Sequence, residues 1–278
     1  METTYFKLIA KKRMMKNYFK CFIVSVFPFT SFLLLVISNY FLFKLLKYVS
    51  HNEYFLPYAE YIPLLGLGVG IVFSIFIWES IKLFVDSYFL LKSLNKKTTF
   101  IKTIKCVSFR QCATSFMVSV IRFFLCISWF AVYLLPCIVV SLLLIYSYKN
   151  ENNGFNINLT LLVSAILLFV IGVSFLYITL KRYSMCSFVV LTDEETSPLK
   201  VIVKSINLME KSSLSYASFC LSYFGWRLSC FFVVPIFYVL PYIALGKWCF
   251  KNSLEVHEFT EPEKNKPIIF YFTKRVPN

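Results

Sequence analysis

Two arginines stand within long apolar stretches of this chain, where an ionised side chain is unusual. Arg122 is flanked by isoleucine and phenylalanine, and Arg227 directly follows a Gly-Trp pair. A charge in hydrocarbon costs at least about 2.5–3.5 kcal/mol at mid-depth unless it reaches the interface or finds a partner. Two carboxylates, Glu79 and Asp86, lie near the end of another apolar stretch. The arginines therefore have two interpretations: they snorkel to phosphates of the inner leaflet, or one of them pairs with Glu79 or Asp86.

Catalytic and metal chemistry are not indicated. Catalysis needs a base, a nucleophile or a metal held in a constellation. The chain has two histidines, His51 and His257, which lie far apart, and nine cysteines that occur singly without a C-x-x-C pair. The apolar stretches contain no histidine, no Asp–Asp pair and no G-x-S-x-G. We therefore predict a protein that is not an enzyme, with no catalytic, cofactor-binding or metal-binding residues.

Four long apolar stretches, followed by a fifth apolar region, must position these side chains. The stretches cover residues 21–43, 62–81, 116–147 and 159–180. Each is about as long as the roughly 20 residues that cross a bilayer, and in lipid such segments must be helices because every backbone polar group needs an internal partner. The chain is 58% hydrophobic and 15% charged, whereas a soluble domain is about half apolar and a quarter charged. These features predict an all-α polytopic membrane protein.

The fifth region, residues 214–249, decides the expected number of helices. As one helix it would be roughly 50 Å long, well beyond the bilayer core. Pro235 and Pro241 interrupt it, which favours two short helices in a hairpin. We expect six transmembrane helices, with five as the alternative. They would form a single helical transmembrane domain over residues 1–254, followed by a polar cytoplasmic tail over 255–278.

The charge distribution indicates the orientation. The net charge is +15, and the basic residues crowd into segments 7–20, 92–110 and 181–211, next to the apolar stretches. Lysine and arginine prefer cytoplasmic loops beside an anionic leaflet, so the N-terminus and the loops 82–110 and 181–213 should be inside. This reading makes the anionic inner leaflet of the lipid bilayer a partner and excludes nucleic acid.

Two segments are expected to be short cytoplasmic helices at the membrane interface. One covers residues 3–20, and the other begins at Ser197-Pro198, a cap followed by a helix-initiating proline. Leu199, Ile202, Ile206 and Met209 recur at helical spacing on the expected apolar face of the second segment. The glycines of residues 66–70 should let another helix approach closely.

The C-terminal third resembles a known family. The resemblance lies in Ser205, Met209, the run LSYFGW at 221–226, Pro241-Tyr242 and Phe250, with Tyr183-Ser184-Met185, Asp193 and, faintly, Leu135-Pro136 upstream. This signature resembles that of a bacterial integral-membrane family catalogued as domain of unknown function 975. Cys137, Lys211 and Cys220 depart from its pattern. The resemblance implies a bacterial origin, hence the cytoplasmic membrane, and a helical membrane fold; the family has no assigned activity.

The same signature suggests a functional or packing cluster. Gly225 should allow close helix contact, Trp226 should fill the resulting groove, and Arg227 should lie near the inner headgroups within reach of Glu79 or Asp86. Function is argued by exclusion. The sequence favours a membrane scaffold or accessory protein that acts through lipids or other membrane proteins, with a transporter or transport-system subunit as the alternative.

Overall fold

The computed structural model describes residues 3–50, 61–96, 99–149, 155–193, 197–210, 212–229 and 233–258. Within these residues every regular element is a helix and no strand occurs. The helices are α1 (Thr3–Met15), α2 (Tyr18–Ser50), α3 (Tyr61–Ser93), α4 (Phe100–Cys106), α5 (Phe109–Lys149), α6 (Phe155–Lys181), α7 (Cys186–Thr192), α8 (Pro198–Met209), α9 (Ser213–Leu221), α10 (Phe224–Ser229) and α11 (Val233–Glu258). A 3-10 helix, η2 (Arg182–Met185), joins α6 to α7. The predicted all-α class is confirmed.

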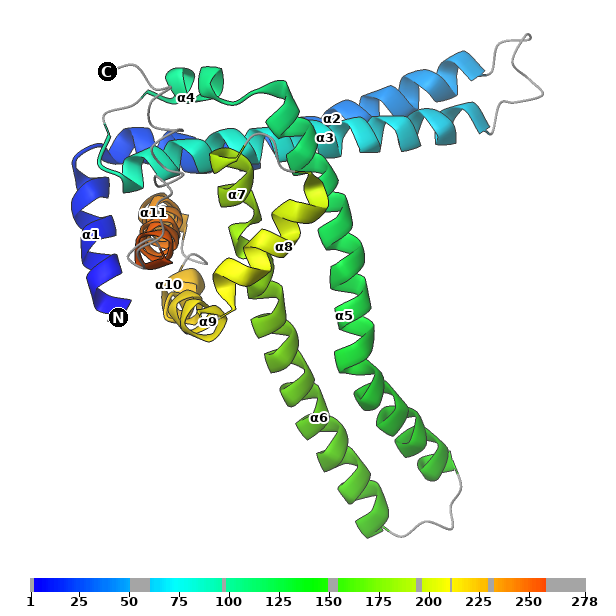
Figure 1. The fold of residues 1–278 in the computed structure, drawn as a ribbon. Coiled ribbons are helices and arrows are strands. Elements are labelled where there is room, and N and C mark those ends of the chain that lie inside the picture. The colour runs from blue at the N-terminus through cyan, green and yellow to red at the C-terminus, as the bar shows by residue number, and fades with distance from the viewer. Residues whose placement is uncertain are drawn as a thin grey trace.

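Two long helical hairpins, α2–α3 and α5–α6, extend in different directions from a shared body of shorter helices (Figure 1). Four helices of the described residues are long and apolar enough to cross a membrane, and they contain all four predicted stretches. The chain therefore has the build of a helical membrane protein. The helices run longer than the predicted stretches. The C-terminal part of α3 continues into the body, and η2 and α7 continue the chain into the body after α6.

The last apolar region does not form a simple hairpin. α9 and α10 have nine and six residues, fewer than the roughly 20 that span a bilayer. α11 is longer, with 26 residues, but much of it is buried within the body, including Leu245 and Trp248. The expected count of six transmembrane helices is thus not confirmed, and neither is the alternative of five.

Glycines hold each hairpin together at close range. In α3, a Cβ added at Gly66 would collide with Leu46 of α2, and one at Gly70 would lie 2.5 Å from Asn39 Oδ1. Gly68 would meet nothing within 4 Å. The predicted close approach therefore holds at two of the three glycines, because the third points away from α2.

A polar tie reinforces the α2–α3 contact. Asn39 Nδ2 donates to Ser74 Oγ at 2.6 Å. In the other hairpin, the hydroxyls of Tyr133 and Thr179 are hydrogen-bonded at 3.0 Å. Such bonds contribute modestly within a membrane, commonly about 0.6 kcal/mol, so they help to set the register while close packing supplies most of the cohesion.

The core of the protein lies in the body, where the C-terminal part of α3 meets α1, α7 and α11, and where α9 packs against α1 and α11. Its largest fully buried side chains include Tyr88 and Phe89 of α3, Phe188 of α7 and Phe219 of α9. Along the apolar lengths of the four long helices, by contrast, only 6–11% of the residues are buried inside the protein. The body is thus internally packed, while the hairpins present their apolar surface outward.

α1 is a short helix as predicted, but its apolar face is covered by protein rather than by lipid. Phe6, Ala10 and Met14 are at most 2% exposed. The ring of Phe6 contacts those of Phe219 and Phe250 edge-on, with centroids 6.2 and 5.2 Å apart. The spacing of the apolar residues indicates a one-sided helix, but it cannot indicate which apolar surface will cover that side.

α8 begins at the predicted cap, with Ser197 as N-cap in extended backbone and Pro198 in the first turn. Of its expected apolar face, Ile202 and Met209 are buried, but Leu199 is 66% exposed. Its buried side is rotated toward Val201, which is fully buried against the body.

The basic connection after the second stretch is shorter than expected. α3 continues through Lys82 and Lys92 to Ser93, and α4 then occupies part of the segment predicted as a loop over residues 82–110. The turn between them carries Asn95 with a φ of 61°, the left-handed conformation that asparagine tolerates at a helix end. Most of the predicted tail, residues 259–278, lies outside the described residues.

Candidate functional site

A charged cavity lies where α3, α5 and α7 meet. Helical spacing places Glu79, Lys82 and Asp86 on one face of α3, since positions i, i+3 and i+7 share a face. Arg122 of α5 and Cys186 of α7 complete the charged and polar lining together with serines of both helices. The cavity has a volume of about 110 Å³. It gathers carboxylates and cations where the hairpins join the body.

α11 closes this region from the side of the body. Trp248 Nε1 donates to Asp86 Oδ1 at 3.2 Å, and the Lys251 ammonium lies 4.7 Å from the centroid of the Trp248 ring. Lys251 is only 6% exposed. Burial lowers the pKa of Lys251, while the Asp86 carboxylate acts in the opposite direction. Asp86 therefore accepts a hydrogen bond from α11, and its negative charge favours the charged form of the buried Lys251 without forming an ion pair with it.

The structure brings three of the sequence-predicted site residues together. Arg122, Glu79 and Asp86 line the same cavity, but among these described residues no ion pair joins Arg122 to either acid, so the pairing of an arginine with one of them stays a prediction. Glu79 Oε1, however, accepts from Lys82 Nζ at 2.8 Å on its own helix. Of the two acids, Asp86 is the one engaged by another helix, through Trp248.

The other three predicted residues lie elsewhere, on α10. The expected close helix contact at Gly225 is wrong, since an added Cβ would meet nothing within 4 Å. Trp226 is 48% exposed and does not fill a groove; its ring contacts those of Tyr238 and Tyr242, each with centroids 6.4 Å apart. α10 is a short exposed helix without a buried residue, so it has no packed surface for Gly225 to fit.

Arg227 is exposed and interacts electrostatically with Tyr177 of α6 and Lys247 of α11. It does not line the cavity of Glu79 and Asp86. Extension of this side chain to lipid phosphates stays a prediction. The two arginines that looked equivalent in the sequence are therefore in different environments.

Sequence reasoning missed Lys251 and Trp248. Lys251 directly follows the last apolar region, where a lysine ordinarily indicates the boundary of the membrane. The signal that could have singled it out is its spacing, three residues after Trp248 on one helical face. A lysine that follows a tryptophan by one helical turn at the end of an apolar helix can be buried in the protein when a neighbouring helix supplies a carboxylate.

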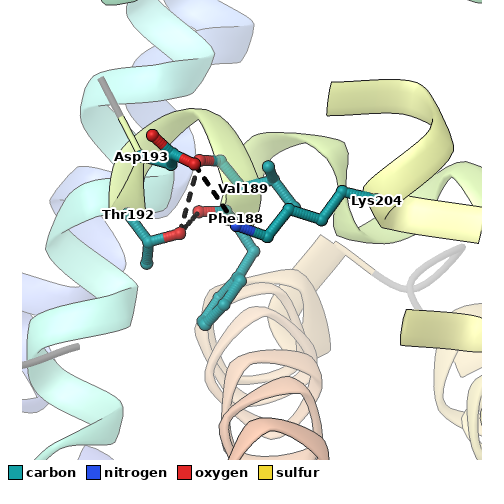
Figure 2. Close-up of polar contacts among 5 residues, drawn as sticks. All are labelled: Phe188, Val189, Thr192, Asp193 and Lys204. Carbon is teal, nitrogen blue, oxygen red and sulfur yellow. Dashed lines mark hydrogen bonds and ion pairs between the residues drawn. The ribbon is translucent and has the colours of Figure 1, made fainter. Parts of the chain in front are cut away.

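A second polar joint fixes α7 and α8, as Figure 2 shows. Lys204 Nζ of α8 lies 3.3 Å from Asp193 Oδ2, directly after α7. Thr192 Oγ1 donates to the carbonyl of Phe188 at 3.0 Å. The Asp193 backbone N–H donates to the carbonyl of Val189 at 2.9 Å and ends α7. Both side chains of the ion pair are about one-third exposed, which limits its contribution to stability.

Residues that carry the family resemblance occupy such joints. Ser205 Oγ donates to the Arg182 carbonyl at 2.8 Å and ties α8 to η2. Trp129 Nε1 donates to Tyr183 Oη at 2.9 Å and ties α5 to the same 3-10 helix. Asp193 is the acid of the pair with Lys204. These positions thus have a clear structural role in connecting the α5–α6 hairpin to the body.

The arrangement offers a small space lined by charged and polar side chains. Within the described residues, no group of three or more histidine, cysteine, aspartate or glutamate side chains could hold a metal ion. No protein-family model, no curated protein and no solved structure matches the chain.

Proposed function

We propose that this protein is a non-enzymatic scaffold or accessory protein of the bacterial cytoplasmic membrane, which acts through protein or lipid partners. The observation that carries the proposal is the contrast between a packed body and open hairpins. The four long helices bury only 6–11% of their apolar lengths within the protein. Lipid or helices of other proteins must cover the rest, because exposed apolar surface of this extent is unfavourable in water. Membership of the family catalogued as domain of unknown function 975 is part of this proposal and rests on the sequence signature.

Two measurements on native membranes test the proposal: photo-cross-linking and co-purification. A photoreactive residue at Val69, which is 70% exposed on α3, should form cross-links to another membrane protein, whereas one at Leu90, 1% exposed on the same helix, should not. The same partner should co-purify in mild detergent and be identified by mass spectrometry. Recovery of the chain alone, with cross-links only to lipid at Val69 and at other exposed positions of both hairpins, would reject a protein scaffold.

Transport is a second candidate, and the charged cavity favours it. Transporters place ionisable residues at sites within the membrane domain, and Arg122 and Asp86 share such a space. If the protein is a transporter, it should purify from mild detergent without a partner protein and should support solute flux in reconstituted vesicles. Flux that persists after Arg122→Gln would argue against a role of this cavity.

The proposed topology places both termini inside, because an even number of spans, four or six, returns the chain to the side where it began. The basic segments beside the hairpins support this orientation. On a background without native cysteines, Asn153→Cys should react with an impermeant thiol reagent from outside, while Lys11→Cys should react only after permeabilisation. The reverse pattern would refute the orientation. Labelling of Ser229→Cys from outside would add the third hairpin that six spans require.

A further inference from the structure

A groove lined by basic residues lies between α1 and the turn that follows α3. Lys12, Arg13 and Lys16 of α1 form one wall, Asn95 of the turn forms the other, and Ile9 contributes an apolar edge. The hollow has a volume of about 280 Å³, close to the lower end of the roughly 300–1,000 Å³ range of small-molecule pockets. The lining residues carry three basic groups and an amide, although most of the groove's exposed surface is apolar.

The two segments that form the groove contain no carboxylate to neutralise these cations. No aspartate or glutamate occurs between Glu2 and Glu53, or between Asp86 and Glu151. The positive field extends further, since Lys20 and Lys92 are close enough to repel each other electrostatically. A groove of like charges without acids on its own walls is stabilised when an anion enters it.

Arg13 makes one contact that leaves its charge available. Its Nη1 donates to Cys249 Sγ of α11 at 3.9 Å, and sulfur is a weak acceptor. Burial raises the pKa of the Cys249 thiol, so this neighbour is protonated near neutral pH and does not neutralise the guanidinium. The contact orients the arginine from behind and leaves further N–H donors for a ligand.

We infer that this groove binds a phosphate ester, carried either by an anionic phospholipid headgroup or by a small soluble phosphate. Arginine and lysine donors converge on phosphate oxygens in charge-assisted hydrogen bonds, and the Asn95 side chain can donate to another oxygen. The inference deepens the proposed function, on which it rests for the membrane setting, by naming a discrete anion site in addition to the general attraction of basic loops to the inner leaflet.

Native mass spectrometry of the full chain in detergent, titrated with phosphatidylglycerol and with phosphatidylcholine, tests this inference. We expect Lys12→Gln/Lys16→Gln to weaken phosphatidylglycerol binding by about tenfold or more, because both cations line the groove. The charge-matched control, Lys11→Gln/Lys105→Gln, removes two exposed basic residues outside the groove and should bind as the wild type does. If the groove variant and the control variant bind phosphatidylglycerol equally, whether or not both bind more weakly than the wild type, the inferred site is wrong.

Two features keep the test decisive. Arg13 is left in place, so its contact with α11 is preserved; if the double variant does not fold, Lys16→Gln against Lys11→Gln gives the same comparison. Inorganic phosphate and glycerol 3-phosphate are then added as competitors. Displacement of the lipid by them identifies a site for soluble phosphate esters, and lipid binding that resists them identifies a headgroup site. All binding is measured on the isolated chain. Absence of lipid binding at the groove would therefore leave the proposed protein partners untouched, and absence of a protein partner would leave the phosphate site untouched.

Discussion

Gly172→Leu should disrupt the α5–α6 hairpin, with a loss of about 1–3 kcal/mol or more in the free energy of unfolding. A Cβ at this buried position of α6 would lie 2.5 Å from the backbone oxygen of Tyr133 and 3.4 Å from Leu134 Cδ2. The nearest atom belongs to the backbone of α5, which cannot rotate away as a side chain can. The two helices would have to separate along a length of the hairpin.

The matched control is Gly225→Leu on α10. An added Cβ meets nothing within 4 Å there, so this variant should be close to the wild type or slightly more stable, because leucine is the better helix former. Unfolding by a denaturing detergent, followed by circular dichroism, measures both variants. An equal loss in the two would show that glycine itself, and not the close approach of α5, determines the effect.

This pair of glycines illustrates what the sequence could and could not indicate. The four long helices follow from hydrophobic length alone, because a bilayer imposes the same requirement on every span. Close helix contact at a given glycine depends on where two helices cross. Gly225 stands in the most recognisable motif and is open, whereas Gly172 stands in an undistinguished apolar run and is in contact with a neighbouring backbone. A composition-based argument has no means of ranking them.

The short helices show a related limit. The apolar residues of α1 predict a one-sided helix, and Phe6 and Met14 do lie on its buried side. Whether lipid or protein covers that side depends on the position of α11, which is more than 200 residues away in sequence. The same limit applies to the candidate site. Arg122 and the acids of α3 could be predicted because they are conspicuous charges in apolar helices. Lys251 could not, because it is buried only by the packing of α11 against the body.

Asp86→Ala should be the most destabilising of the charge substitutions, with an expected loss of about 1–3 kcal/mol in the free energy of unfolding, because it leaves the indole N–H of Trp248 without its acceptor. It also removes the carboxylate whose field favours the charged form of Lys251, a side chain that is 6% exposed. Glu79→Ala is the control. Its partner Lys82 has a side chain that is 41% exposed, so water can solvate the lysine that remains, and the loss should stay within about 1 kcal/mol.

A second substitution separates the loss of charge balance from simple loss of packing. Lys251→Met retains an apolar side chain of similar length beside Trp248 and removes the buried ammonium. Combined with Asp86→Ala it should recover the part of the lost stability that comes from the Lys251 charge, but not the part that comes from the missing acceptor of Trp248. Unfolding of the two single variants and the double variant gives a double-mutant cycle, in which coupling between contacting groups typically amounts to about 0.5–3 kcal/mol. Additive losses would mean that Lys251 is balanced by another group and that Asp86 acts only as the acceptor for Trp248. Recovery would show that Asp86 and Lys251 are coupled across the contact between α3 and α11.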